Sequence, residues 1–316
     1  MKYSVIDSIC DNLTAKEYVT NPAIAREEEI KRLMVVLLAP EKSALLVGKP
    51  GIGKTAIVEG LAYLIQKDMV PDVLKGYTIY KVNSSSLMNK ITIDGNEVLA
   101  INLLVDELKS MSKIILFIDE VHTLIGSNSD SPIDLANILK PSLDRGDIKA
   151  IGATTNIEYE NFVVRDRAFL RRFDRIDVLE PSGETTIEIL FKSLPRYEHQ
   201  TGIRFKYNDY ITKMLLESIV SATSEYKRIY GLSAMYPDVA FSVLSQAFSL
   251  ALVDNRSEVT ILDVYNAIKI SKRIYPDSII KELTLFREKF SKVCVDEGIV
   301  LPVVTINDID VNDEIR

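Results

Sequence analysis

Short apolar segments alternate along the first half of the chain with segments in which apolar residues recur at helical spacing. The short segments are residues 43–47, 78–82, 113–118, 149–153 and 175–179, and the clearest helical periods span 55–66 and 98–108. Alternation of this kind is typical of a parallel sheet covered by helices on both faces. The pattern therefore predicts an α/β domain, a doubly wound parallel five-stranded sheet, over residues 21–180.

Beyond residue 183 the pattern changes to helical periods alone, and it contains no convincing strand. The periods span residues 185–194, 209–222, 238–253, 262–271 and 279–292. Asp209 and Asp238 stand where two of these helices begin and are expected to cap them. We expect a smaller all-helical domain over 181–275, a C-terminal helix with a solvated acidic tail over 276–316, and an N-terminal extension over 1–20.

Composition and charge narrow the class of protein. The chain has 316 residues, with 38 Lys and Arg against 45 Asp and Glu, for a formal net charge of −7. This balance disfavours a protein that coats nucleic acid or an anionic membrane. Apolar stretches fall far short of the roughly 20 residues that cross a bilayer, and the N-terminus does not resemble a signal peptide. Cys10 and Cys294 form no disulfide or zinc pattern, so we expect a cytoplasmic protein.

A glycine-rich segment carries the strongest chemical signal. Residues 48–55 read GKPGIGKT, follow an expected strand and open an expected helix, as in loops whose backbone N–H groups surround phosphates. Lys54 would neutralise the β- and γ-phosphates of ATP, and the Thr55 hydroxyl would bind Mg²⁺. A chance glycine-rich turn is the alternative, and the strand-loop-helix setting argues against it. The residues expected to contact the nucleotide here are Pro50, Gly51, Ile52, Gly53, Lys54 and Thr55.

Two acids follow the apolar segment that ends at Ile118. Asp119 and Glu120 belong at the carboxyl end of a buried strand, where doubly wound sheets bind their ligands. Asp119 is expected to hold Mg²⁺ through water, and Glu120 is expected to polarise the water that attacks the γ-phosphate. Taken alone, the pair could be a helix cap. Together with the glycine loop it favours hydrolysis over binding alone.

Several motifs in fixed order resemble the AAA+ ATPases, and in particular the first ATPase module of Clp-type unfoldases and disaggregases. The resemblance covers about residues 20–275. It rests on residues 21–30, 51–61 (GIGKTAIVEGL), 115–123 (ILFIDEVHT), 139–146 (LKPSLDRG), 152–155 (GATT) and 170–173 (LRRF).

The resemblance implies further roles for single residues. Ile24 matches the segment that lines the adenine pocket, with Ala25 where the family usually has glycine. Thr155 matches the residue that senses the γ-phosphate. Arg171 and Arg172 match the pair that reaches into the neighbouring subunit's site, which implies a ring-shaped homo-oligomer, usually a hexamer.

Two groups of residues leave alternatives open. The arginines near residue 170 could instead form a solvated helix face or a nucleic-acid patch, and the match of Arg171 and Arg172 to the LRRF motif makes the intersubunit role the preferred interpretation. His122 lies two residues after Glu120 and invites a catalytic role. A hydrogen-bonded structural role is the preferred interpretation.

The chain departs from the family pattern in two places. In the loop that grips polypeptide in the family, Gly95 aligns with the family glycine, so that Ile93 replaces the aromatic residue and Asp94 the arginine. In the expected helical lid, residues 236–240 match a motif that places Asp238 at the nucleotide, and Val239 replaces a basic residue there. These departures put the usual grip on substrate in doubt and imply modest turnover.

Two functions follow from these predictions. The first is an ATP-hydrolysing ring that remodels a protein partner. The second is an ATP-dependent switch or assembly scaffold with weak hydrolysis, within a nucleic-acid or mobile-element system. Glu120 and the arginine pair favour the first function, whereas the missing aromatic residue at position 93 favours the second.

Overall fold

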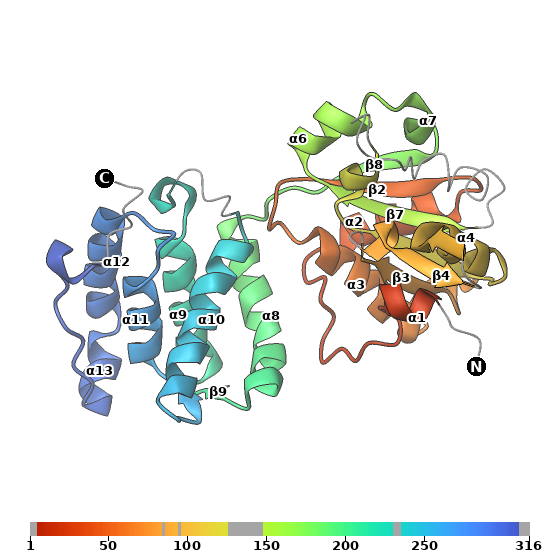
Figure 1. Cartoon of the computed structure of the whole chain (residues 1–316). Helices are drawn as coiled ribbons and strands as arrows, with labels where there is room; N and C mark the ends of the chain where they lie inside the picture. Colours follow the sequence, from red (N-terminus) through yellow and green to blue (C-terminus); the bar gives the residue numbers. More distant parts are fainter. Residues whose placement is uncertain (1–4, 84–85, 94–95, 126–147, 230–234, 310–316) are drawn as a thin grey trace. The chain divides into compact units, whose positions relative to one another are not determined.

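The chain divides into two compact units, here in a computed structural model that describes residues 5–83, 86–93, 96–125, 148–229 and 235–309. Unit 1 comprises Met1–Lys49 and Gly53–Leu179, and unit 2 comprises Pro50–Ile52 and Glu180–Arg316. Figure 1 shows both units with the labels used below. Within the described residues, no helix is both long and apolar enough to span a membrane.

A six-stranded sheet forms the centre of unit 1, in the order β1-β3-β6-β7-β2-β8. Its strands are β1 (Cys10–Asn12), β2 (Ser43–Val47), β3 (Thr78–Val82), β6 (Ile114–Ile118), β7 (Lys149–Thr154) and β8 (Phe173–Asp177). The last five strands run parallel, which confirms the predicted doubly wound sheet, while β1 adds an antiparallel edge beside β3. The sequence pattern missed β1 because three residues are too few to show an alternation.

Helices cover both faces of this sheet (Figure 1). Helices α1 (Val5–Ile9) and α4 (Ala100–Lys109) share one core cluster with residues of β2, β3 and β6. That cluster includes Leu45 and Val47, so Leu46 between them points to the opposite face. Helix α2 (Glu27–Leu38) packs on β2 and on α3 (Lys54–Gln66). All five residues of β2 and of β6 are buried, as expected for the central strands of a parallel sheet.

A hairpin of β4 (Lys90–Ile93) and β5 (Asn96–Leu99) precedes α4. The helical period predicted from residue 98 therefore begins two residues later, because Val98 pairs with Ile91 across the hairpin. The short connecting elements of unit 1 are the 3-10 turns η1 (Asp72–Leu74), η2 (Ser86–Met88) and η3 (Val121–Leu124), helix α6 (Asn156–Glu158), the π-turn η4 (Tyr159–Val163) and helix α7 (Arg167–Leu170).

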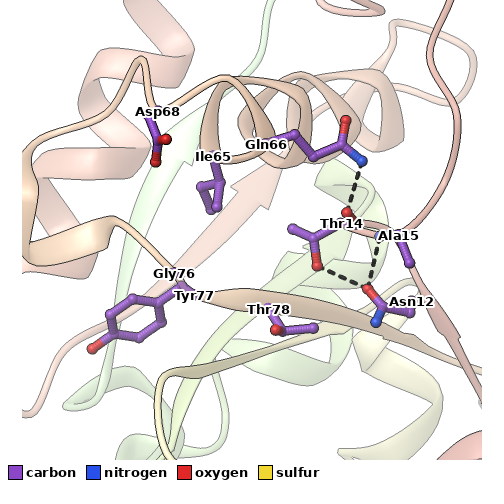
Figure 2. A pocket seen from close by; sticks show the side chains of 9 residues that line it. All are labelled: Asn12, Thr14, Ala15, Ile65, Gln66, Asp68, Gly76, Tyr77 and Thr78. Carbon is purple, nitrogen blue, oxygen red and sulfur yellow. Dashed lines mark hydrogen bonds between the residues drawn. The ribbon is translucent and has the colours of Figure 1, made fainter.

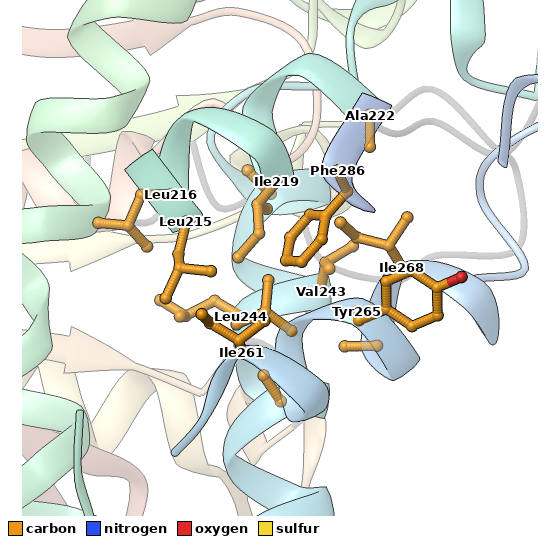
Figure 3. Packing of buried hydrophobic residues seen from close by; sticks show 14 of the residues in the cluster. Leu215, Leu216, Ile219, Ala222, Val243, Leu244, Ile261, Tyr265, Ile268 and Phe286 are labelled. Carbon is orange, nitrogen blue, oxygen red and sulfur yellow. The ribbon is translucent and has the colours of Figure 1, made fainter. Parts of the chain in front are cut away.

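Unit 2 is built mainly from helices, which share one core cluster. The helices are α8 (Gly183–Thr201), α9 (Asp209–Ala222), α10 (Asp238–Val253), α11 (Ile261–Lys269), α12 (Pro276–Lys289) and α13 (Ser291–Glu297), with 3-10 turns η5 (Glu225–Lys227) and η6 (Ile306–Asp308). Side chains from α9, α10, α11 and α12 point toward one another, among them Leu215, Val243, Tyr265 and Phe286 (Figure 3). Burial of such side chains is the main stabilising contribution to this unit.

Three predictions for unit 2 were wrong in detail. The region is not all-helical, because β9 (Arg204–Phe205) pairs in parallel with β10 (Glu258–Val259). Helix α9 is capped by Asn208, whose Oδ1 accepts from Ile211 N at 3.0 Å, and not by Asp209. Asp238 is the first residue of α10 and makes no capping hydrogen bond there.

The C-terminal segment is also less solvated than its acidic residues suggested. Leu301, Val304 and Ile309 are each at most 8% exposed and belong to the core of unit 2. The Tyr265 hydroxyl donates to the Pro302 carbonyl oxygen at 2.6 Å. The prediction of a solvated tail over 302–316 was therefore wrong for Val304 and Ile309, which anchor the segment, while Pro302, Val303 and residues 305–308 are exposed.

Candidate functional site

The glycine loop joins β2 to α3 in the conformation that its sequence predicts. Gly51 and Gly53 both have positive φ, at +76° and +98°, in the left-handed region that side chains disfavour. Gly53 is the N-cap of α3, so the first N–H groups of that helix open onto the loop. Backbone donors and the helix dipole there suit an anionic ligand.

Lys54 places its ammonium group against this loop. Its Nζ donates to the carbonyl oxygens of Gly48 at 2.8 Å and Lys49 at 3.1 Å. Burial lowers the pKa of the Lys54 ammonium, although the carboxylates of Asp119 and two nearby glutamates oppose that shift. Binding of a phosphate group would stabilise the charged form of this partly desolvated ammonium.

Thr55 and Asp119 come together beside Lys54. The Thr55 hydroxyl donates to Asp119 Oδ2 at 3.1 Å, which joins the start of α3 to the end of β6. A hydroxyl and a carboxylate are the hard oxygen donors that Mg²⁺ prefers. No group of three or more His, Cys, Asp or Glu with metal-binding geometry occurs among the described residues. The hydroxyl of Thr55 and the carboxylate of Asp119 therefore fit a magnesium ion.

Glu120 follows Asp119 in a strained backbone conformation. Its φ of +51° lies in the left-handed region, which is uncommon for a residue with a side chain and often marks functional sites. Its N–H donates to Asp119 Oδ1 at 3.2 Å, and its carbonyl accepts from Thr123 N and Oγ1, both at 2.9 Å. The backbone is thus fixed while the Glu120 side chain stays exposed.

Thr155 sits at the end of β7 as the N-cap of α6. Its Oγ1 accepts from Glu158 N at 3.3 Å, and Glu158 Oε2 accepts from Thr155 N at 3.0 Å. These reciprocal bonds form a capping box, which holds the Thr155 oxygen in place and leaves its hydroxyl hydrogen able to donate.

Glu158 also contacts His122, a relationship that sequence reasoning missed. Its Oε2 lies 3.2 Å from His122 Nδ1 and 3.3 Å from Thr154 Oγ1. Burial raises the pKa of the Glu158 carboxyl, but hydrogen bonds from Thr155 and Thr154 and the nearby His122 outweigh it, so that the pKa lies below its ordinary value. His122 stands in a hydrogen-bonded network, which supports its structural interpretation. The Thr-x-x-Glu spacing of residues 155–158 was the available signal.

The segment predicted to line the adenine pocket packs on α3. A side chain at Gly60 would meet the Cβ of Ala23 at 2.2 Å, so the two backbones approach as closely as glycine allows. Ile24 follows and is half-buried. Ala25 has a φ of +55°, in the left-handed region that glycine adopts more readily than alanine.

Arg171 and Arg172 occupy the turn between α7 and β8. The Arg171 side chain is exposed, whereas Arg172 is half-buried and its N–H donates to Phe169 O at 2.9 Å. Arg175, which the sequence left unassigned, stacks on the Tyr159 ring at 4.3 Å and pairs with Asp177 at 2.7 Å. Arg175 therefore has a role within the subunit, while the intersubunit role of the other two arginines stays a prediction.

Asp238 and Val239 lie in unit 2, at the start of α10. Asp238 Oδ2 pairs with Arg273 Nη1 at 2.8 Å. Val239 is fully buried in the core of that unit, an environment that suits an apolar side chain. The contact of Asp238 with nucleotide stays a prediction.

The predicted substrate-gripping loop falls at the β4–β5 hairpin. Lys90 and Glu97 form an ion pair across it at 2.6 Å, and Ile93 is the last residue of β4, paired with Asn96. Asp94 and Gly95 lie outside the described residues, as does the motif over 139–146.

A surface hollow of about 320 Å³ lies elsewhere on unit 1. It is lined by Asn12, Thr14, Gln66, Tyr77 and their neighbours, and Gln66 Nε2 donates to the Thr14 carbonyl oxygen at its wall (Figure 2). None of the predicted nucleotide-site residues lines it, so this hollow is not the nucleotide site.

The strand order and the polar residues together define a class of protein. Strand β7 lies between β2, which leads into the glycine loop, and β6, which leads into Asp119 and Glu120. This arrangement is that of a P-loop nucleotide-binding fold. Residues 44–180 match the family of ATPases associated with various cellular activities (AAA). The chain carries an AAA+ module that resembles the first ATPase module of Clp-type proteins.

Individual relatives support the resemblance to Clp-type proteins. The chain is 39% identical over 238 residues to the chaperone protein ClpB of Aquifex aeolicus, covering 75% of this chain and 23% of that protein. It is 38% identical over 251 residues to a ClpA homolog protein of Fuscovulum blasticum, covering 78% of this chain and 30% of the relative.

Solved structures of Hsp104 from S. cerevisiae have the same fold. An ADP complex matches with a TM-score of 0.67 at 31% identity, over 92% of this chain and 48% of that one. A casein complex in an extended conformation matches with a TM-score of 0.69 at 29% identity, over 95% and 54%. The chain thus spans less than a third of the length of the curated relatives named here and about half of the solved chains.

Proposed function

We propose that this chain binds and hydrolyses ATP with Mg²⁺, as an oligomeric ring in the cytoplasm that remodels a protein partner. The observation that carries the proposal is the meeting of Thr55 with Asp119 at 3.1 Å, next to Lys54 on the loop and Glu120 on the following turn. Phosphate-binding, metal-binding and water-activating groups then share one edge of the sheet. The similarity to ClpB and ClpA supports the same activity.

Each residue has a distinct part in the proposed hydrolysis. The loop N–H groups and Lys54 bind and orient the phosphates, and Thr55 with Asp119 would hold Mg²⁺, which supplies positive charge against the charge that develops on the phosphoryl oxygens. Glu120 accepts a proton from the attacking water. Thr155 donates to the γ-phosphate or to that water.

Arg171 and Arg172 would complete the site of a neighbouring subunit. Arginines supplied from another chain stabilise transition-state charge and raise turnover strongly. The exposure of Arg171 supports this proposal, as does the likeness to Hsp104. ATP turnover per chain should then rise with protein concentration as the ring assembles.

The decisive experiment compares wild type with Glu120→Gln and, as a control, Glu160→Gln, which alters an exposed carboxylate in the same unit. We expect Glu120→Gln to lower kcat by about 100-fold or more, in the range that a general base contributes, while a fluorescent ATP analogue still binds. Arg171→Ala should remove the concentration dependence. Background turnover in wild type despite tight ATP binding would contradict hydrolysis.

Two candidate functions differ in the kind of partner that the chain acts on. Ile93, at the position where the family resemblance leads us to expect an aromatic residue, favours a second candidate, an ATP-dependent switch or scaffold in a nucleic-acid or mobile-element system. Turnover that is raised by unfolded protein and not by DNA or RNA supports remodelling. The reverse response supports the second candidate. The Glu120→Gln variant, held in its ATP-bound form, is the bait for capturing the partner.

A further inference from the structure

Lys81 lies beside the proposed metal ligand Asp119. Strand β3 pairs in parallel with β6 so that Lys81 stands opposite Phe117, and Asp119 follows two residues later on the same side. Lys81 Nζ lies 5.8 Å from the centre of the Phe117 ring and 3.4 Å from Asp119 Oδ2. The side chains of Lys81 and Asp119 are 32% and 30% exposed. The sheet register therefore holds an ammonium group against the acidic end of β6.

The same carboxylate oxygen also accepts the hydroxyl of Thr55, at 3.1 Å. Lys54, another cation near Asp119, directs its Nζ to the carbonyl oxygens of Gly48 and Lys49. Asp119 thus pairs with a lysine from β3 that lies outside the glycine-loop and acidic motifs.

We propose that the Lys81 ammonium group is a permanent positive charge beside the metal site, and that this charge sets the Mg²⁺ concentration the protein needs to bind ATP. The inference rests on the proposed function, since it concerns the same phosphate and metal groups. In the absence of Mg²⁺, the Lys81 ammonium offsets the charge of Asp119 and attracts the triphosphate. In its presence, Lys81 repels the divalent ion and competes with it for Asp119.

Removing the charge of Lys81 has two opposite consequences. Metal-free ATP binding weakens, because Asp119 then faces the phosphates without its partner. The Mg²⁺ concentration needed for half-maximal binding falls, because the ion meets an unneutralised carboxylate. Both effects are moderate, about 3- to 10-fold, since the pair is a third exposed and is screened by solvent and salt.

The experiment measures binding of a fluorescent ATP analogue by anisotropy, first in EDTA and then along a Mg²⁺ titration. Lys81→Met keeps the stem of the side chain over Phe117 and removes the charge. Lys81→Arg keeps the charge. Lys75→Met is the matched control, because Lys75 pairs with Asp72 at 2.7 Å on the surface of the same unit.

We expect Lys81→Met to raise Kd in EDTA and to lower the half-saturating Mg²⁺ concentration, each by about 3- to 10-fold, with both values near wild type in Lys81→Arg and Lys75→Met. A Mg²⁺ requirement that is the same in Lys81→Met and wild type overturns the inference and leaves the ATPase proposal intact. Absence of nucleotide binding by wild type overturns both. If Lys81→Met does not fold, a Lys81→Gln variant with wild-type requirements likewise overturns the inference.

Discussion

His122 Nδ1 lies 3.2 Å from Glu158 Oε2, which joins the turn after Glu120 to the turn that presents Thr155. The same carboxylate oxygen accepts the backbone N–H of Thr155 at 3.0 Å. Glu158 therefore holds Thr155, a residue of the proposed site, and links it to the turn that follows Glu120.

We predict that Glu158→Ala lowers kcat by about 10-fold while the affinity for ATP stays near that of wild type, because a misplaced Thr155 weakens only transition-state contacts. Steady-state kinetics, with binding of a fluorescent ATP analogue measured separately, checks this prediction. Glu158→Gln should recover part of the loss, since its amide oxygen can still accept from Thr155. A change in Kd equal to the change in kcat would mean that the residue supports binding instead.

Glu158 also makes stability depend on pH. Its pKa is lowered in the folded protein, because hydrogen bonds and His122 outweigh the effect of burial. A lowered folded pKa stabilises the folded state above the unfolded carboxyl pKa of about 4.3. That contribution disappears as pH falls through the folded pKa. The difference in unfolding free energy between wild type and Glu158→Gln, measured in urea at pH 7 and near pH 3.5, should therefore shrink at the lower pH. A constant difference would contradict the prediction.

Ala25 offers a test of backbone strain. A left-handed conformation costs an L-residue roughly 1–2 kcal/mol, whereas the added freedom of glycine in the unfolded chain costs about 0.4–1 kcal/mol. We therefore predict that Ala25→Gly raises the unfolding free energy by about 0.5–1 kcal/mol. The control is Ala39→Gly, because Ala39 has a φ of −68° and should only lose stability. Equal losses in both variants would show that Ala25 carries no strain.

Asp263 is the least exposed charged residue among the described residues of unit 2. It is 2% exposed and accepts from Arg256 Nη1 at 2.7 Å and from Thr260 N at 2.7 Å. We predict that Asp263→Ala lowers the unfolding free energy by about 2–4 kcal/mol, because Arg256 and the start of α11 lose their acceptor. Thermal unfolding checks the loss. Asp254→Ala, which removes an exposed partner of the same arginine, should cost less than about 1 kcal/mol.

The sequence predicted the central strands of the sheet well. The strands at 43–47 and 78–82 match the structure at both ends, although only the first is buried throughout. The sequence pattern did not predict β9 and β10, because two residues are too few to show the alternation of a strand. The burial of Val304 and Ile309 was missed because acids and exposed residues dominate the segment around them.

In the candidate site, motifs predicted the residues proposed to bind and hydrolyse the nucleotide, but not the residues that contact and position them. Lys54, Thr55, Asp119 and Glu120 follow from local spacing alone. Lys81 pairs with Asp119 from a neighbouring strand, and the 31 residues 83–113 separate the two strands in the chain, so that contact depends on sheet register rather than on any motif. Glu158 could have been noticed as part of a capping box, yet its contact with His122 required the fold.

The packing of the C-terminal segment determines where the chain can be truncated without unfolding unit 2. Phe286 of α12, Phe290 at its C-cap, and Leu301 and Val304 further along the chain belong to the core of unit 2. A boundary placed near residue 275, where the predicted helical domain ends, would strip these side chains away and leave their apolar neighbours facing water. A recombinant fragment that is to keep unit 2 folded therefore has to continue at least through Ile309.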